Sequence, residues 1–458
     1  MKRKNFTIIL IMLTLIFASN TNPSWAADGH EEYIKVCLKS GSTEDDSYSL
    51  ISNEGFVLCS IQDGFLMEDM VLPDYTALEV VKMDDQIVLM DNEGNFVMED
   101  LLESTVIMPL DYHNEGLITF ENTPYRGGII IIPNQNGSLS ALNYITMEHY
   151  LYGVLNAEIH HTHPEEALKA QAVAARSFAK LNMGKHRAEG FDVCCTTHCQ
   201  VYRGYTGEYE KTNKAVDDTF GEVIAYNGRP VAAYYFKNSG GHTQDVGDVW
   251  SYNEPYLIGI EDEHSPVYPW NVSLTYETIK SRLESGGYYP GNVESVTIKE
   301  RNKNGHVSNL EISGTQSVVN LTKEKIRNVL GATVVKSLNF TLEGGQGGVQ
   351  GQERQKIVVS NGPRSSILNN ETYIICSSGN VTKRLTTDLY ASNGSGLVKL
   401  IEDDGQNVSS SNGVTFKGYG YGHGVGMPQD SAIEMAKLGF SYLDILKKYY
   451  TDIEIIKM

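Results

Sequence analysis

Hydrophobic residues fall on one helical face in residues 146–159 of the chain. The positions concerned are Tyr150, Leu151, Val154, Leu155 and Ile159. Thr146 precedes them and is a residue type that caps helix N-termini. After a polar turn, Pro164 and two glutamates suit the first turn of a second helix, whose body is rich in alanine. We therefore expect two helices that pack closely at the centre of the chain.

Short apolar runs separated by turn residues dominate the rest of the chain. In residues 28–122 they occupy 33–38, 55–60, 86–90 and 105–108, which predicts a β-rich module. Two more predicted strands, 127–133 and 141–145, lead into the helices, and Asn227-Gly228 predicts the turn of a hairpin over 221–236. The predicted fold class is α+β: a β-rich protein with a central helix pair and an N-terminal β-rich module.

Residues 1–27 have the layout of a signal peptide. A basic start precedes an apolar run from Phe6 to Ala18, and small residues follow at Ala26 and Ala27. The run is short for a membrane-spanning helix, which needs about 20 residues. We expect a secreted or cell-wall-associated protein that acts outside the cytoplasmic membrane; an uncleaved N-terminal anchor is the alternative.

Composition narrows the classes of partner. The 458 residues are 41% hydrophobic and 21% charged, which is ordinary for a globular protein. The formal net charge is -20, so the chain lacks the general positive surface that phosphate contact needs, and we expect no nucleic-acid partner.

Glu158 stands near the end of the first predicted helix, where the helix dipole disfavours a carboxylate. A carboxyl group in such a setting can have a raised pKa, which is what a general acid needs. The alternative is a solvated surface glutamate.

Cysteine and histidine cluster once in the sequence. Cys194, Cys195, His198 and Cys199 lie within six positions, and His186 precedes them. Thiolates and imidazoles at this spacing suit tetrahedral zinc. A disulfide or a set of buried thiols is the alternative, although adjacent cysteines cannot easily form a relaxed bridge. Cys37 and Cys59 lie in strand-like runs and could pair with each other in an oxidising compartment.

Two glycine-containing segments offer contacts for a polymer. The loop 237–244 places donors and acceptors beside two glycines, and in residues 418–426 every second residue is glycine around His423. The loop 237–244 lets a ligand approach the backbone closely, and the 418–426 segment suits a polysaccharide that passes over the backbone. The alternatives are an ordinary polar loop and a tightly packed strand pair, respectively.

Four stretches closely resemble the stage II sporulation protein D family (SpoIID/LytB domain). Residues 150–158 match Tyr-Leu-x-Gly-Val-x-x-x-Glu, and 166–176 read Glu-Ala-Leu-Lys-Ala-Gln-Ala-Val-Ala-Ala-Arg. Residues 192–202 match Asp-x-Cys-x-x-x-His-Cys-Gln-x-Tyr, and 420–429 match Gly-x-Gly-His-Gly-Val-Gly-Met-x-Gln. Cys195, Pro428 and Asp430-Ser431 depart from the family pattern.

The resemblance implies a division of the chain and a site. Residues 1–27 would be a signal peptide or anchor, 28–122 the N-terminal module and 123–458 a SpoIID-like catalytic domain with an insertion at about 344–414. The family's catalytic glutamate falls on Glu158, and the zinc ligands would be Cys194, His198, Cys199 and, as a plausible fourth, His186. The expected sugar-binding residues are Gln171, Arg176, Ser239, Gly240, Gly241, His242, Thr243, His423, Gly424 and Gln429.

The activity implied by the resemblance is that of a peptidoglycan lytic transglycosylase. Such an enzyme cleaves the β-1,4 bond between N-acetylmuramic acid and N-acetylglucosamine and leaves a 1,6-anhydro end, in sporulation or wall remodelling. Structural zinc, peptidoglycan glycan strands and a cell-wall amidase are the implied cofactor and partners. The alternative is a non-catalytic wall-binding enhancer of an N-acetylmuramoyl-L-alanine amidase. A zinc hydrolase is a weaker reading, because thiolate-rich closed sites are usually structural.

Overall fold

The computed structural model describes residues 32–134, 138–344 and 412–458. Between 345 and 411 it gives only the backbone of short strands: β22 (Ile357–Ser360), β23 (Ser365–Leu368), β24 (Ile375–Cys376), β25 (Gly379–Asn380), β26 (Tyr390–Ser392) and β27 (Leu397–Lys399). The expected signal peptide and most of the 344–414 insertion therefore lie outside the described residues. Among the residues that are described, no helix is both long and apolar enough to span a membrane.

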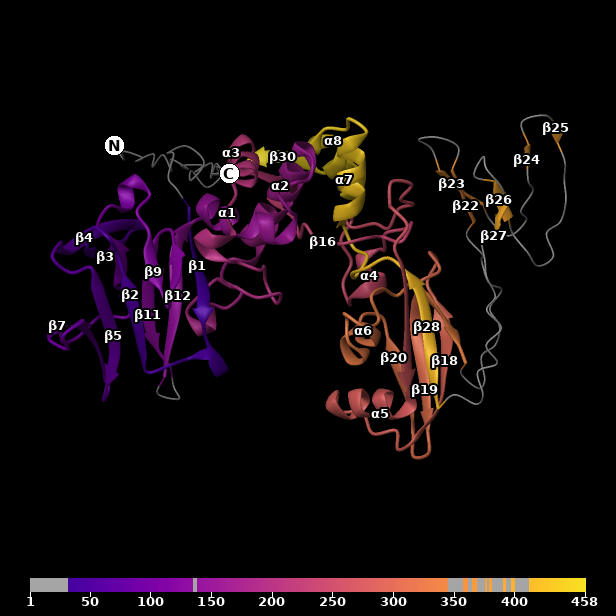
Figure 1. Ribbon diagram of the computed structural model, residues 1–458, viewed down its shortest axis with the longest axis horizontal. Coiled ribbons are helices and arrows are strands. Elements are labelled where there is room, and N and C mark those ends of the chain that lie inside the picture. Colours follow the sequence, from indigo (N-terminus) through magenta and orange to yellow (C-terminus); the bar gives the residue numbers. More distant parts are fainter. Residues whose placement is uncertain are drawn as a thin grey trace, which may run out of the picture.

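The N-terminal part is a β-sandwich (Figure 1). One sheet has the order β13-β1-β12-β11-β8-β3-β4 and the other β10-β9-β2-β5-β6-β7. The strands are β1 (Tyr33–Lys39), β2 (Ser47–Ile51), β3 (Phe56–Gln62), β4 (Phe65–Leu72), β5 (Ala77–Met83), β6 (Gln86–Asp91), β7 (Phe96–Met98), β8 (Val106–Pro109), β9 (Ile118–Phe120), β10 (Thr123–Tyr125), β11 (Gly128–Pro133), β12 (Leu139–Thr146) and β13 (Val193–Cys194). Alternate residues, among them Leu50, Phe56 and Leu89, face the core between the sheets.

The two strands that lead into the helices lie inside this sandwich. β12 pairs antiparallel with β1 from Tyr33↔Thr146 to Lys39↔Ala141, and with β11 on its other side. The expected boundary between residues 122 and 123 therefore falls within one hydrogen-bonded unit. Cys37 on β1 and Cys59 on β3 have three strands between them, and both are free thiols, so they do not pair.

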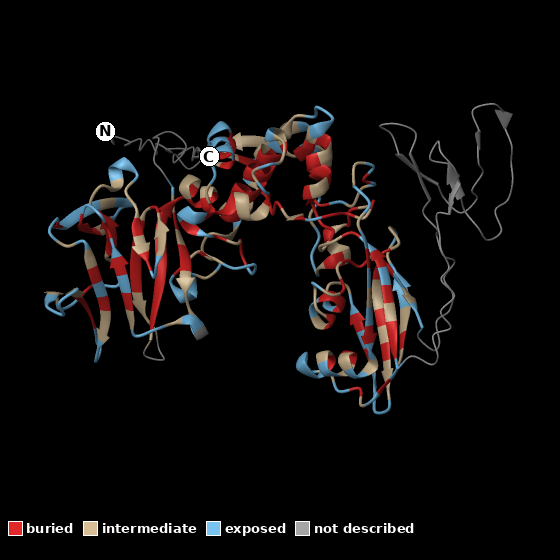
Figure 2. Cartoon of the chain, in the orientation of Figure 1, coloured by how far each residue is buried: buried red, intermediate tan, exposed pale blue. Residues whose placement is uncertain are grey.

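The middle of the molecule is helical. It contains α1 (Met147–Glu158), α2 (Glu165–Asn182), α3 (Glu210–Asp218), α4 (Val246–Val249), α7 (Gln429–Lys437) and α8 (Tyr442–Tyr449), with β14 (Glu222–Tyr226), β15 (Arg229–Pro230), β16 (Tyr235–Phe236), β29 (Met427–Pro428) and β30 (Glu454–Lys457) beside them. The alanine-rich body of α2 is buried on nearly all sides, as Figure 2 shows in red, because alanine lets several elements approach it closely. The Asn227-Gly228 turn forms as predicted, with φ of 52° and 70° at these two residues.

A further lobe follows in the chain and has a hydrophobic core of its own. It consists of β17 (Pro269–Thr275), α5 (Tyr276–Ser285), β18 (Val293–Arg301), β19 (Val307–Gly314), β20 (Val318–Thr322), α6 (Lys325–Leu330), β21 (Phe340–Glu343) and β28 (Gly413–Tyr419). In Figure 1 this lobe and the sandwich stand on either side of the helical middle. The α+β fold class, the helix pair and the β-rich N-terminal module are confirmed.

Candidate active site and adjoining histidine–cysteine cluster

Glu158 is the last residue of α1. The helix begins where Thr146 Oγ1 accepts a hydrogen bond from the backbone N–H of His149, so the predicted cap is confirmed. It ends because Ile159 takes an extended conformation, with φ of -137°. The last carbonyls of a helix lack partners within the helix. The Glu158 carbonyl finds one in the Gln429 side chain, whose Nε2 donates to it at 2.9 Å.

The Glu158 side chain is half-buried, and its carboxyl group is held at two points. Burial raises the pKa of this carboxyl above the usual value for glutamate, while hydrogen bonds from the Val201 backbone and the Tyr235 hydroxyl lower it. Among the described residues, no second carboxylate contributes to the shift in the pKa of Glu158. Burial therefore keeps the Glu158 carboxyl group protonated to a higher pH than that of an exposed glutamate.

A chain of buried polar side chains orients Tyr235. Gln200 Nε2 donates to the Tyr235 hydroxyl oxygen at 3.0 Å, and Tyr150 donates to Gln200 Oε1 at 3.2 Å. Because the Tyr235 oxygen already accepts from Gln200, its own hydrogen is free to point at Glu158. Our sequence analysis did not single out Tyr235 or Gln200 as site residues. Gln200 stands in the matched 192–202 segment, whereas no local signal marks Tyr235.

Gln171 and Gln429 lie next to Glu158, as expected, but inside the protein. Their exposed fractions are 0% and 7%. Gln429 Nε2 also approaches Gln171 Oε1 at 3.4 Å, and the Gln171 Nε2 group has no hydrogen-bond partner within the described part of the chain. This amide pair fixes the end of α1 and thus the position of Glu158. Sugar binding by these side chains, which we predicted, does not fit their burial.

Arg176 is a scaffold residue rather than the sugar-binding residue that we predicted. Its side chain is fully buried and forms a two-point ion pair with Glu148, with Nε–Oε1 at 2.9 Å and Nη2–Oε2 at 2.6 Å. Its remaining N–H groups donate to the carbonyls of Glu222 and Val216. With its donors in use inside the core, the guanidinium cannot reach a sugar.

The loop that follows β16 is also tied down internally. Ser239 and Ser431 both donate to Asp262 Oδ2 at 2.7 Å, and Tyr449 donates to Oδ1 at 2.9 Å. Ser239 is 3% exposed, so its hydroxyl serves the buried Asp262 carboxylate instead of the ligand that we predicted.

The neighbouring loop residues show the same pattern. Thr243 is buried and pairs with the backbone of Ile260, and the half-buried His242 points Nδ1 at the Thr243 carbonyl. Gly240 has φ of 64°, and a Cβ there would lie 2.8 Å from the Tyr419 carbonyl oxygen. Gly241 also has positive φ, and its N–H donates to Ser239. These contacts tie the loop to other elements of the fold, and sugar binding by the half-buried Gly240 and His242 stays a prediction.

The alternate glycines of 418–426 serve close packing, which was the alternative interpretation. A Cβ at Gly422 would lie 2.6 Å from Phe236, one at Gly424 2.7 Å from Gln244, and one at Gly426 2.0 Å from the Tyr234 oxygen. The segment thus packs against residues 234–244 and brings β29 beside β16. Gly424 is therefore a packing position and not the sugar contact that we predicted.

His423 is enclosed by aromatic rings, with centroid distances of 5.1 Å to Trp250 and 5.3 Å to Phe236. Its Nε2 lies 3.1 Å from the Tyr235 carbonyl, and its Nδ1 accepts from the Val425 N–H at 3.1 Å. Burial lowers the pKa of His423 to about 3, so the ring is neutral at physiological pH. Its contact with the Tyr235 carbonyl holds the strand that carries Tyr235, and the expected sugar contact of His423 stays a prediction.

The four predicted metal ligands come together in space. The ligand atoms of His186, Cys194, His198 and Cys199 all lie within 4.8 Å of one another. The Sγ–N distances are 3.7 Å for Cys194–His198, 3.5 Å for Cys199–His186 and 3.6 Å for Cys199–His198. Two ligands of a tetrahedral zinc ion are separated by about 3.6 Å when one is sulfur and the other nitrogen. The donor set and its spacing therefore fit zinc.

The surroundings of the cluster agree with a metal site. The other ring nitrogen of His186 lies 2.8 Å from Glu189, a partner of the kind that orients metal-binding histidines. Cys195 is not part of the cluster, since its thiol points toward the Leu38 carbonyl. Gln200 and Val201, which contact the Tyr235–Glu158 pair, directly follow Cys199 in the chain, so the cluster anchors one wall of the site.

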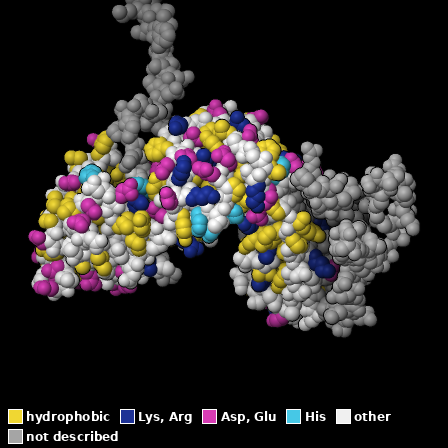
Figure 3. Space-filling model, turned by 45° about the horizontal axis from the view of Figure 1, so that its top comes forward, with side chains coloured by type: hydrophobic (Ala, Val, Ile, Leu, Met, Phe, Trp, Pro, Cys, Tyr) yellow, Lys and Arg dark blue, Asp and Glu magenta, His cyan; other side chains and the backbone are white. Residues whose placement is uncertain are grey.

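On the face shown in Figure 3, the surface is hollowed between the sandwich and the further lobe. Histidine side chains gather at the rim of this hollow, and Lys, Arg, Asp and Glu intermingle around it. The formal charge of -20 is thus not concentrated as a continuous acidic face here.

Two segments of the chain match known protein families. Residues 135–226, which carry Glu158 and the histidine–cysteine cluster, match a family described as "Stage II sporulation protein". Residues 249–360 match a family described as a domain of unknown function.

Three similar proteins extend the comparison. The chain is 27% identical to an uncharacterized protein of Brachyspira hyodysenteriae, over 81% of this chain and 84% of the relative. It is 28% identical to the "Amidase enhancer" of Bacillus subtilis, over 78% of this chain but only 48% of that protein. It is 24% identical to the "Stage II sporulation protein D" of Bacillus subtilis, over 71% and 79% of the two chains.

Proposed function

From the premise that this chain belongs to the stage II sporulation protein D family, we propose that it is a peptidoglycan lytic transglycosylase that acts outside the cytoplasmic membrane. The observation that carries the proposal is the raised pKa of the Glu158 carboxyl group. Burial raises this pKa, Tyr235 and Val201 hold the group by hydrogen bonds, and no second carboxylate of the described residues contributes to the shift in its pKa. Ordinary glycoside hydrolysis uses two carboxyl groups, whereas intramolecular attack needs one.

In the proposed reaction, protonated Glu158 gives its proton to the glycosidic oxygen between N-acetylmuramic acid and N-acetylglucosamine. As that C1–O bond breaks, the Glu158 carboxylate takes the proton of the C6 hydroxyl of the muramic acid. The O6 atom bonds to C1 and closes the 1,6-anhydro ring. No water is consumed, and Glu158 returns to its protonated state. The raised pKa favours the first step because the group must start as an acid.

We further propose that His186, Cys194, His198 and Cys199 hold a structural zinc ion. Four protein ligands would fill a tetrahedral site and leave no open position, which is the arrangement of structural zinc sites. Bound zinc would tie the 186–199 segment together. The segment would in this way hold Val201, which bonds to the Glu158 carboxyl group, and Gln200, which orients Tyr235 toward it.

The test is mass spectrometry of the soluble products after incubation of the purified protein with glycan strands that lack stem peptides and with intact peptidoglycan. We expect 1,6-anhydromuramic ends with the wild type and none with Glu158→Gln, which preserves shape but cannot donate a carboxyl proton. Circular dichroism confirms that the variant is folded. Near-wild-type activity of Glu158→Gln would contradict the assignment, and reducing ends would indicate a hydrolase with a second carboxyl group.

A second candidate function is that of a wall-binding enhancer of an amidase, which is favoured by the similarity to a protein named amidase enhancer. In that case the protein would release no anhydro sugars from either substrate. It would sediment with the wall and increase product formation by an added N-acetylmuramoyl-L-alanine amidase, equally well with Glu158→Gln.

A further inference from the structure

The N-terminal module carries nearly all of the net charge of the chain. Residues 28–122 contain 22 of the 57 Asp and Glu residues but only 3 of the 37 Lys and Arg residues, so their formal charge is -19, against -20 for the whole chain. Figure 3 shows acidic and hydrophobic side chains interspersed on the visible face of the sandwich. The reaction proposed above uses none of these side chains. Such an excess of one sign raises the local concentration of cationic partners.

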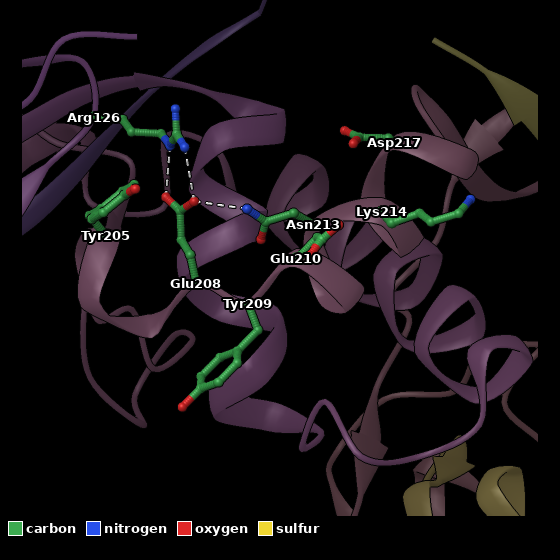
Figure 4. Close-up of a pocket in the computed structure, with 8 residues that line it drawn as sticks. All are labelled: Arg126, Tyr205, Glu208, Tyr209, Glu210, Asn213, Lys214 and Asp217. Carbon is green, nitrogen blue, oxygen red and sulfur yellow. Dashed lines mark hydrogen bonds and ion pairs between the residues drawn. The ribbon is translucent and has the colours of Figure 1, made fainter.

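The side of the sandwich that meets the helical middle is already in use. Arg126, which follows β10, donates to Glu208 through Nε at 2.8 Å and Nη2 at 3.1 Å (Figure 4). Beside this ion pair, the 3₁₀ turn η5 (Gly204–Gly207) lies against β10, so that a Cβ at Gly204 would meet the Tyr125 ring at 2.6 Å. The edge of the sandwich at β10 is therefore covered by another part of the same chain.

Strand β4 is a long edge of the sandwich that no other described strand covers. It is the last strand of the seven-stranded sheet and pairs with β3 on one side only. It lies at the opposite edge from β13, far from the helical middle (Figure 1). β4 has eight residues, whereas β7, the outer strand of the second sheet, has three. A strand paired on one side presents a row of backbone N–H and C=O groups to which another strand can add.

Apolar side chains of β4 are open to solvent on both faces of the sheet. Met67, Met70 and Val71 are 47%, 41% and 49% exposed. Met70 stands opposite Leu58, which faces the core between the sheets, and Val71 stands opposite Val57, which faces the outer side. Methionine adapts its shape to different partners and is frequent at surfaces that bind peptides. An added strand would therefore find apolar neighbours whichever way its side chains point.

Two acidic residues in the middle of β4 select among the possible occupants. Glu68 and Asp69 are exposed, and Asp69 is a bulge residue without a partner on β3. If β4 paired antiparallel with β4 of a second copy, centred on the strand, these carboxylates would face each other, which is unfavourable. Among the described residues no Lys or Arg pairs with either of them, and His113 lies 3.9 Å from Glu68. Charge thus opposes a second copy and favours a cationic strand.

We propose that β4 is a docking strand for an extended, cationic segment of a partner protein, which adds to the sheet beside it. The segment pairs its backbone with the open N–H and C=O groups of β4. Its apolar side chains contact Met67, Met70 and Val71, and its Lys or Arg side chains pair with Glu68 and Asp69. Because β4 lies at the opposite edge of the sheet from β13, docking there does not depend on the reaction proposed for Glu158.

The test is fluorescence anisotropy of a labelled peptide that alternates lysine and valine and matches the eight residues of β4 in length. We expect saturable binding to the purified full-length protein at about 0.15 M salt. A peptide of the same composition with D-valine should bind about tenfold more weakly, because alternating chirality prevents the pleated strand that the backbone hydrogen bonds need. A peptide that alternates lysine and serine should bind about fivefold more weakly, because it loses the apolar contacts.

Two double variants with the same change in net charge locate the binding site. Glu68→Lys/Asp69→Lys should weaken binding of the lysine–valine peptide about tenfold or more. Glu79→Lys/Glu93→Lys is the matched control, because both residues are exposed on the same module but lie on β5 and in the turn before β7. It should bind within about twofold of the wild type. Circular dichroism and the melting temperature confirm that both variants are folded.

Three results would overturn docking at β4. Equal weakening by the two double variants would show attraction by the general charge of the module alone. Equal binding of the L-valine and D-valine peptides would exclude strand addition. A wild-type dimer in sedimentation velocity that the lysine–valine peptide dissociates would make a second copy the occupant of the edge.

Discussion

At the scale of single residues, Glu158 is set apart by what surrounds it rather than by its type. It ends a helix, where the dipole disfavours negative charge, and it is half-buried with neutral donors instead of a cation. Glu148, on the same helix, is by contrast paired with the buried Arg176. Two glutamates ten residues apart on one helix therefore lie in opposite environments: Glu148 is paired with a buried cation, whereas the Glu158 carboxyl group is held by neutral donors and has a raised pKa.

The raised pKa of Glu158 predicts how stability depends on pH. A carboxyl group with a higher pKa in the folded state stabilises the protein below its unfolded pKa of about 4.3, and this contribution is lost as pH rises through the folded-state pKa. Glutamine does not titrate. The unfolding free energy of Glu158→Gln minus that of wild type should therefore increase from pH 4 to pH 8, as measured by urea denaturation.

An exposed glutamate provides the control for that series. Glu277→Gln, on the surface of α5, should change the unfolding free energy by less than about 0.5 kcal/mol at each pH. A Glu158→Gln difference that is constant with pH, or that favours the wild type more at pH 8 than at pH 4, would contradict burial of the acid.

At the scale of elements, two segments with little regular secondary structure position the site. The 186–199 segment delivers Gln200 and Val201 to Glu158, and the glycine-rich 418–426 segment delivers Gln429. Irregular backbone has few ladder hydrogen bonds, so each segment depends on side-chain clustering or on close backbone packing for its shape.

The histidine–cysteine cluster predicts a bound zinc ion, and Cys195, which follows the proposed ligand Cys194 but lies outside the cluster, provides a matched control. The purified protein should contain about one zinc ion per chain by elemental analysis. Cys199→Ser should lose the metal and melt several degrees lower, because a structural zinc ion contributes folding free energy. Cys195→Ser should keep the zinc ion and the melting temperature of the wild type, since the Cys195 thiol faces the Leu38 carbonyl. Full metal content in Cys199→Ser, or loss in Cys195→Ser, would contradict the ligand set.

The close packing of residues 418–426 predicts that alanine costs more stability at a glycine inside this segment than at a glycine of similar backbone conformation outside it. Gly426 and Gly439 have φ of 76° and 91°, so alanine is strained at both. A Cβ at Gly426 would meet the Tyr234 oxygen at 2.0 Å, whereas nothing lies within 4 Å at Gly439. Gly426→Ala should destabilise the protein by about 3 kcal/mol and Gly439→Ala by about 1 kcal/mol in chemical denaturation. Equal costs would show that the segment is not closely packed.

At the scale of the whole molecule, the helix α1 that carries Glu158 is continuous with the N-terminal sandwich. β12 is hydrogen-bonded between β1 and β11 and runs directly into α1. The sandwich thus fixes the direction in which the helix that carries Glu158 leaves the sheet. The further lobe contacts the 237–244 loop of the helical middle through Asn302, whose Nδ2 donates to Gln244 Oε1 at 3.0 Å. The hollow seen in Figure 3 lies between these two parts.

The sequence alone determined those features that depend on neighbours a few residues apart. Helix α1 with its Thr146 cap, the Asn227-Gly228 turn and the grouping of Cys194, His198 and Cys199 all follow from short-range spacing, as does the α+β class. The resemblance to a known family pointed to Glu158 for the same reason, because its matched segment is contiguous.

Only the tertiary structure decided which side chains face a ligand and which face the core. Gln429 meets Glu158 across 271 positions of sequence, and Gln200 meets Tyr235 across 35, so no local pattern reveals either contact. Arg176 and Ser239 are polar, and we therefore predicted from the sequence that their side chains bind a sugar. The fold instead buries them against Glu148 and Asp262. The physical reason is that a polar group can be satisfied by ligand, water or protein alike, and only the position of distant partners selects among these.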